Sequence, residues 1–197
     1  MKRHTRASFV PVAIALLVAT GWTSAANMVY LPLETQAAAV DCVLRGRVLE
    51  KTSHWLGDRV TIATTLRVQV LDAMKGDMMN GSLVEVRYLG GTTPDGIRLF
   101  YEGMPRAEVG NEIVFFLMEM GDGRLTPWAV QQSFLHVRAN PDTGRPEVVR
   151  DLAGVAVLEE YLDGETPFDR MALEEMRQRV ERGIHSPPAG SLWLREN

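Results

Sequence analysis

Cysteine is almost absent from this chain, because Cys42 is the only one among 197 residues. A single cysteine excludes every disulfide within the chain and every metal site built from paired cysteines. Cys42 opens an apolar stretch, so we interpret it as a small buried hydrophobic residue rather than a reactive or intermolecularly paired thiol. The apolar core must therefore stabilise the fold without covalent cross-links.

The known signatures of catalysis and of cofactor binding are also missing. The sequence contains no HExxH, paired CxxC, GxSxG or Walker motif, and no GxGxxG after a predicted strand. His54, His136 and His185 lie at unrelated places, so they lack the spacing of zinc ligands. Acid pairs such as Glu159-Glu160 are sequence neighbours and are most simply solvated charges. We therefore expect no catalytic residue, no cofactor and no metal ion.

Long apolar runs are scarce, and the one at the start has the build of a secretory signal. Residues 1–26 combine Lys2, Arg3 and Arg6 with an apolar run from Phe9 to about Val18 and then small residues. The run is shorter than the roughly 20 residues of a membrane-spanning helix. We predict a cleaved signal peptide over residues 1–26, and hence a secreted or periplasmic protein without a stable membrane anchor after cleavage.

Positive charge is in deficit. The whole chain has 21 Lys and Arg against 25 Asp and Glu, and removing residues 1–26 takes away three basic residues and no acid. The formal net charge then falls from −4 to −7. A net acidic surface argues against nucleic acid or an anionic membrane as the partner.

What the sequence does contain is a strong strand pattern at residues 59–72. One parity carries five aliphatic residues, namely Val60, Ile62, Leu66, Val68 and Val70, whereas Thr61, Thr65, Arg67 and Gln69 lie on the other. This alternation is typical of a half-buried strand. Burying the five side chains contributes roughly 7–15 kcal/mol, and ordering each residue costs about 1–2 kcal/mol. The strand therefore needs neighbours, and we expect it to be the central member of a sheet.

The rest of the chain supplies those neighbours. Further strands are expected at 42–51, 82–89, 111–120, 126–139 and 147–152, with a loop at 51–58, a glycine-rich excursion at 90–110 and short helical turns from about Glu34. Thr166, Pro167 and Asp169 resemble a helix start and Gly183 a C-cap, which predicts a helix over 166–183. Residues 184–197 are expected to form a flexible tail.

This order of elements resembles small oligonucleotide/oligosaccharide-binding (OB) barrels, particularly the netrin-like domain of tissue inhibitors of metalloproteinases. The stretches VLRGRVLEKTSHW, VTIATTLRVQVLDAMKG, YLGG, PRAEVGNEIVFFL and WAVQQSFLHV also resemble a recurrent type of exported bacterial protein, over roughly residues 28–150. The resemblance implies a mainly β fold: a five- to six-stranded antiparallel OB-like barrel over 27–165, with the helix 166–183 packed on it. Those inhibitors begin with a cysteine and contain many disulfides, so no inhibitory residue is transferred to this chain.

The candidate partner-binding residues lie on two predicted loops. They are His54, Trp55, Asp95, Arg98 and Arg106, chosen because aromatic and arginine side chains on loops supply most of the binding energy at interfaces. Trp55 has a second interpretation, in which it folds back to cap one end of the barrel. We expect an exported, non-catalytic binding or adaptor module whose partner is another envelope or secreted protein.

Two alternatives stay open. The first is an envelope hydrolase or peptidase accessory with a carboxylate-based site, which requires converging carboxylates with shifted pKa values. The second is a purely structural envelope component, for which the indicator is a large exposed apolar patch that includes residues 192–194.

Overall fold

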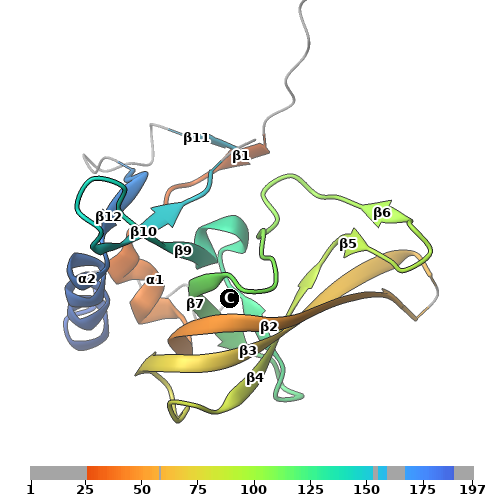
Figure 1. Cartoon of the computed structure of the whole chain (residues 1–197), viewed down its shortest axis with the longest axis horizontal. Coiled ribbons are helices and arrows are strands. Elements are labelled where there is room, and N and C mark those ends of the chain that lie inside the picture. Colours follow the sequence, from red (N-terminus) through yellow and green to blue (C-terminus); the bar gives the residue numbers. More distant parts are fainter. Residues whose placement is uncertain (1–25, 58, 153–154, 159–166, 189–197) are drawn as a thin grey trace, which may run out of the picture.

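The fold is a mainly β structure whose strands belong chiefly to one eight-stranded sheet (Figure 1). The computed structural model describes residues 26–57, 59–152, 155–158 and 167–188. In sheet order the strands are β12 (Arg170–Ala172), β10 (Pro146–Arg150), β9 (Phe134–Ala139), β7 (Glu112–Glu119), β2 (Cys42–Leu56), β3 (Thr61–Lys75), β4 (Leu83–Leu89) and β8 (Leu125–Pro127).

Two short strand pairs and three helical segments complete the described chain. β1 (Ala26–Met28) is parallel to β11 (Val155–Val157), and β5 (Gly91–Thr92) is antiparallel to β6 (Arg98–Leu99). The helices are α1 (Leu33–Ala39), the 3₁₀ turn η1 (Val130–Ser133) and α2 (Leu173–His185).

Five strands are joined in a ring, in the order β7, β2, β3, β4 and β8. The prediction of a mainly β fold with a C-terminal helix is confirmed, but the ring is not a closed barrel. The reason is that β8 has only three residues and meets β4 at one parallel pair, Val86 with Leu125. Barrel closure requires strands whose pairing and stagger match around the whole ring.

β3 is central, as its alternating pattern predicts. Ile62, Leu66, Val68 and Val70 are each at most 1% exposed. Val60, the fifth aliphatic residue of the pattern, is instead 70% exposed, because it lies in the turn before the strand begins at Thr61.

The sheet has apolar side chains on both faces, which form two separate cores. The interior of the ring holds the first core, and the space between the sheet and the two helices holds the second. β7 contributes to both, because Ile113 and Phe115 point into the ring while Val114 and Phe116 point to the helices. Its continuous apolar run is therefore explained by burial on both faces.

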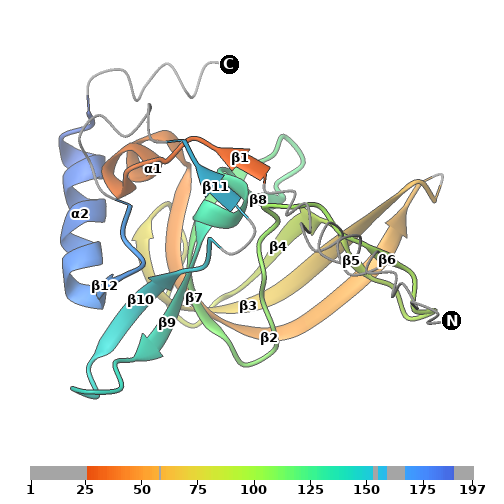
Figure 2. The same ribbon diagram turned by 90° about the horizontal axis from the view of Figure 1, so that it is seen from above.

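α1 and α2 pack side by side on one face of the sheet (Figure 2). The Lys75 ammonium group donates to the carbonyl oxygens of Ala37, Ala38 and Val40 at 2.7, 3.1 and 2.6 Å, so it caps the C-terminal end of α1. Arg179 donates two hydrogen bonds of 2.9 Å to the Glu34 carboxylate, which ties α2 to α1.

The start and end predicted for the C-terminal helix are wrong. Thr166 lies outside the described residues, Pro167 and Phe168 are not helical, and α2 begins only at Leu173, after β12. Gly183 does not end the helix; it is buried inside the last turns, where a Cβ atom would lie 2.3 Å from the Glu34 carbonyl oxygen. This glycine serves close helix packing rather than capping. Leu173, Met176 and Val180 form an apolar stripe on α2 that is buried in the second core, which explains the packing of the helix on the sheet.

Two predicted terminal segments fall largely outside the described residues. These are the signal peptide, described only at Ala26, and the tail, described only up to Pro188. Within the described ranges, no helix has both the length and the apolar character needed to span a membrane.

Candidate functional site

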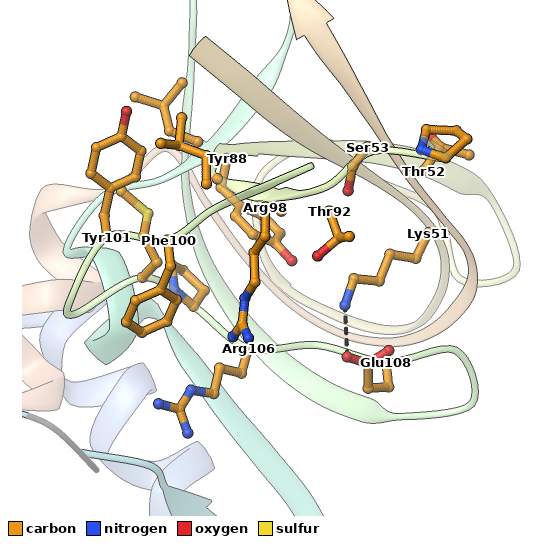
Figure 3. Close-up of a pocket in the computed structure, with 17 residues that line it drawn as sticks. Lys51, Thr52, Ser53, Tyr88, Thr92, Arg98, Phe100, Tyr101, Arg106 and Glu108 are labelled. Atoms are coloured by element: carbon orange, nitrogen blue, oxygen red, sulfur yellow. Dashed lines mark hydrogen bonds and ion pairs between the residues drawn. The ribbon is translucent and has the colours of Figure 1, made fainter. Parts of the chain in front are cut away.

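A groove of about 570 Å³ lies between β2 and the chain that connects β4 to β7 (Figure 3). One side is formed by residues 51–53 of β2 and by the end of β4, and the other by residues 98–108. The groove is open to solvent, and its lining mixes charged, hydroxyl and aromatic side chains. It is larger than the hollow of about 460 Å³ between β7 and β9.

The β2 side of the groove is part of an arm, which is the portion of the β2–β3 hairpin that lies beyond β7. β2 and β3 are each fifteen residues long and stay paired to Leu56 and Thr61, whereas β7 reaches only Arg47 of β2 (Figure 2). On the other side of the arm, β4 still pairs with β3 from Ala63 to Gln69. The loop predicted at 51–58 is therefore wrong, because β2 continues to Leu56. The polar run of Lys51, Thr52 and Ser53 concealed the strand, since both faces of the arm are partly wet.

Gly91 lets the chain that leads to the other side of the groove pass close to β2 and β3. The chain leaves β4 through Gly90 and Gly91, at φ angles of 91° and 130°, and passes over the arm. A Cβ on Gly91 would lie 2.2 Å from the Thr64 hydroxyl oxygen and 2.5 Å from that of Ser53, so only glycine permits this approach. The pair is thus explained by close backbone packing.

A short hydrogen-bond chain lies beneath this crossing. The Thr64 hydroxyl, which is fully buried, donates to the Gly90 carbonyl oxygen at 2.7 Å. The hydroxyl oxygens of Ser53 and Thr64 are 2.8 Å apart. Because each hydroxyl has one hydrogen to give, Ser53 is the donor to Thr64. The chain fixes the end of β4 against the arm.

Tyr88 forms part of the inner end of the groove. Its ring packs edge-on against Phe134, with centroids 5.9 Å apart, and the residue is 8% exposed. Burial raises the pKa of the Tyr88 phenol to about 12, although the neighbouring Thr64 side chain opposes the shift. At neutral pH the phenol is therefore protonated, which suits a hydrogen-bond donor and not a base.

The groove is positive on a chain that is negative overall. Its ionisable lining residues, tyrosines apart, are Lys51, Arg98, Arg106 and Glu108. The Lys51 ammonium lies 2.7 Å from the Glu108 carboxylate and spans the groove (Figure 3). Arg106 lies 3.9 Å from the carboxylate of Asp151 and keeps half its side chain exposed. Arg98 lies over the Phe100 ring, with its Cζ atom 5.5 Å from the ring centroid. Within the described residues we find no carboxylate that forms an ion pair with Arg98.

Apolar side chains surround the same groove. Leu89, Ile97, Phe100 and Tyr101 are between 38% and 49% exposed, and all except Ile97 line it. Aromatic and arginine side chains are the types enriched where proteins bind other proteins. The groove thus combines positive charge with exposed apolar area in one place.

The structure brings only two of the five predicted site residues into the groove, Arg98 and Arg106. Asp95 is exposed in the turn between β5 and β6 and does not line it. His54 lies in β2, not in a loop, and its Nε2 is 3.4 Å from a guanidinium nitrogen of Arg87. Alternation along the strand places His54 on the face opposite Ser53. Trp55 shares the face of Ser53 and is half-buried, but it lies farther along the arm than the groove.

Sequence reasoning missed most of the groove residues, among them Lys51, Ser53, Tyr88, Phe100 and Glu108. Tyr88 was assigned only to the strand at 82–89, Ser53 to the loop at 51–58, and Lys51 to the boundary between strand and loop. No hydrophobic pattern in the sequence marks Lys51 and Ser53, because residues 51–54 are all polar. The alternation of half-buried and exposed residues from Lys51 to Trp55 is visible only in the folded chain.

The groove offers little for acid–base chemistry. Glu108 is the only carboxylate that lines it, and this group pairs with Lys51. Within the described residues no group of three or more His, Cys, Asp and Glu side chains could hold a metal ion. The buried Cys42 lies elsewhere, and desolvation raises the pKa of its thiol to about 12, which makes it a poor nucleophile.

A second, smaller hollow of about 460 Å³ lies where β7 and β9 meet. It is lined by Arg47, Glu112, His136 and Arg138, among others. Burial lowers the pKa of His136, and the positive charge of Arg138 lowers it further. The imidazole is therefore neutral at physiological pH, and Glu112 already pairs with Arg47 at 3.4 Å.

Comparison with protein-family models and with curated proteins found no match for this chain. The resemblance to netrin-like domains therefore stays a prediction.

Proposed function

We propose that the chain is an exported, non-catalytic binding or adaptor module that holds part of another envelope or secreted protein in the groove between β2 and residues 98–108. The observation that carries the proposal is the coincidence of Arg98, Arg106 and Phe100 at one preformed hollow. Each residue is exposed at the groove, and each is of a type that dominates binding energy at interfaces. Export rests on the signal-like residues 1–26.

Both sides of the groove are held by contacts within the fold, so a partner can bind without a large loss of conformational entropy. The hydrogen-bond chain from Ser53 through Thr64 to Gly90 holds one side of the groove. On the other side, Ala107 is 1% exposed and belongs to the ring core, which anchors the segment that carries Arg106 and Glu108. A groove held in this way loses less conformational entropy when a partner binds.

The hydrolase alternative finds less support at this groove. Its single carboxylate, Glu108, forms an ion pair, whereas acid catalysis by carboxylates needs a second group or a raised pKa. The structural alternative depended on residues 192–194, which lie outside the described residues. A binding function therefore accounts for more of the described features than either alternative.

The test is capture of partners from the organism's own envelope fraction by the mature chain and by two variants. In the groove variant, Arg98→Ala is combined with Phe100→Ala. In the control variant, Arg67→Ala removes an arginine of similar exposure from the opposite face of the same arm. Both variants should keep the stability of the wild type within about 0.5 kcal/mol, because the altered side chains are surface-exposed.

We expect the wild type and the Arg67→Ala control to capture the same protein, and the groove variant to capture at least 10-fold less of it. Loss of about 1.4 kcal/mol of binding energy is enough for that factor. Equal capture by all three chains would contradict the proposal.

A further inference from the structure

β2 has a long backbone edge that no strand of the described chain covers. β7 pairs with β2 from Cys42 to Arg47, and Val48 adds hydrogen bonds to Gly110 and Asn111 at 2.8 and 2.9 Å. Beyond this point residues 49–56 stay paired with β3 on one edge only (Figure 1). Eight residues at about 3.3 Å each give an open edge of about 26 Å.

The chain turns away from β2 at a defined place. Glu108 and Asn111 form a tight turn, in which the Asn111 backbone N–H donates to the Glu108 carbonyl and the Asn111 side chain accepts from the Glu108 N–H, both at 3.0 Å. β7 begins just after this turn, at Glu112. If β7 were longer, it would lie next to residues 49–56 of β2. The chain turns away instead, so no strand of the described chain occupies that position.

The groove lies along that uncovered edge. Lys51, Thr52 and Ser53 line it from β2, and Arg106 and Glu108 line it from the opposite side. The space beside the edge is thus an open hollow of about 570 Å³ and not a region filled by the protein's own side chains. Uncovered strand edges readily pair with another chain, because their backbone N–H and C=O groups are unpaired.

We infer that residues 49–56 of β2 accept an extended segment of a partner protein as an added strand, and that this segment carries acidic side chains. The inference rests on the proposed binding function and specifies its mode. Three cationic groups, on Lys51, Arg98 and Arg106, line the groove against the single carboxylate of Glu108. An incoming carboxylate can replace Glu108 beside Lys51 and pair with the two arginines.

The probe is a set of ten-residue peptides, selected from a random displayed library on the mature chain. We expect selected peptides to alternate Asp or Glu with β-branched or aromatic residues, as an added strand with one face towards the cations requires. Lys51→Glu should weaken their binding at least 10-fold, whereas Arg67→Glu, on the opposite face, should not. Failure to select any peptide, or selection of basic ones, would overturn the inference.

Backbone pairing is tested separately from side-chain recognition. In an added strand, every second backbone N–H of the peptide points towards β2. N-methylation of those amides should weaken binding at least 10-fold, whereas N-methylation of the intervening amides should have little effect. On binding, about half of the backbone amides in residues 49–56 should become protected from hydrogen exchange. If groove variants weaken binding but neither signature appears, the strand-addition mode is wrong and the binding function stands. If Arg98→Ala and Lys51→Glu leave peptide binding unchanged, the proposed function fails at this groove.

A second copy of this chain is the competing occupant of the edge. Sedimentation of the mature chain without peptide decides between them. We expect a monomer with residues 49–56 unprotected from exchange. A dimer that protects these amides would overturn the acidic-partner inference in favour of edge-to-edge pairing between copies.

Discussion

Gly183 provides the sharpest test of how α1 and α2 pack, because helix propensity and packing predict opposite effects for its replacement. In an isolated helix, Gly→Ala stabilises by about 1 kcal/mol. In this fold, the added Cβ would lie 2.3, 2.7 and 2.8 Å from the carbonyl oxygen, Cα and carbonyl carbon of Glu34. All three atoms belong to backbone, so no side-chain rotation can relieve the contact.

The expected size follows from the movement that Gly183→Ala requires. To restore ordinary van der Waals contact between the new Cβ and the Glu34 carbonyl oxygen, the two helices must move apart by about 1 Å. A gap of that size forfeits a quarter to a half of the attraction between facing atoms. Overpacking of this kind costs about 3 kcal/mol at the upper end of its usual range. After the gain in helix propensity, we expect Gly183→Ala to lower the free energy of unfolding by about 2 kcal/mol, and Tm by about 4–8 °C.

The assay is urea and thermal unfolding of the mature chain, followed by circular dichroism. Glu181→Ala is the matched control, since Glu181 lies on the exposed side of the same helical turn, and its unfolding free energy should change by less than about 0.5 kcal/mol. A peptide with the α2 sequence should become more helical with Gly183→Ala, which separates propensity from packing. If Gly183→Ala in the full chain is as stable as the wild type, the close α1–α2 approach is refuted.

Two further predictions concern the charged groups that hold the helices. Lys75→Met keeps the apolar stem but removes three hydrogen bonds to the end of α1, so it should lower the unfolding free energy by about 1–3 kcal/mol; an unchanged urea midpoint would contradict this. For Glu34, burial alone would raise the pKa, but the hydrogen bonds and charge of Arg179 and the other groups around it lower it below 4.5. Because the pKa of Glu34 is lower in the folded than in the unfolded state, its carboxylate stabilises the fold above pH 4.5. That contribution is lost as the pH falls through the folded-state pKa. Glu34→Gln should therefore flatten the fall in stability below pH 4.5, and a parallel fall in both proteins would disprove the linkage.

Much of the fold could be predicted because each main strand carries its own burial pattern. Alternation identified β3, and strands were also expected over the residues of β4 and β7. Boundaries failed where tertiary contacts decide them. Gly183 looks like a helix stop in isolation, yet α2 continues through it because α1 needs a residue without a side chain there. The strand predicted at 126–139 is interrupted by η1, which local pattern did not reveal.

The site was predictable only in part, because it depends on which segments meet in space. Arg98 and Arg106 were found from their residue type within a glycine-rich stretch. Lys51 and Glu108 could not be paired from sequence, since 57 residues separate them and only the path of the excursion brings them to 2.7 Å. His54 was misplaced because the polar run that precedes it concealed the strand, and its face of the strand depends in turn on the bulge between Val48 and Glu50.

The open edge of β2 has one cause, a mismatch of strand lengths. β2 and β3 have fifteen residues each, whereas their neighbours β7 and β4 have eight and seven. β4 pairs with β3 from Ala63 to Gln69, but β7 pairs with β2 only from Cys42 to Arg47, so the second half of β2 keeps an open edge. The residues of β2 in that half, from Leu49 to Leu56, are mostly polar, so leaving them wet costs little apolar burial. The length of β2 beyond β7 therefore supplies the open edge beside which the cationic groove lies.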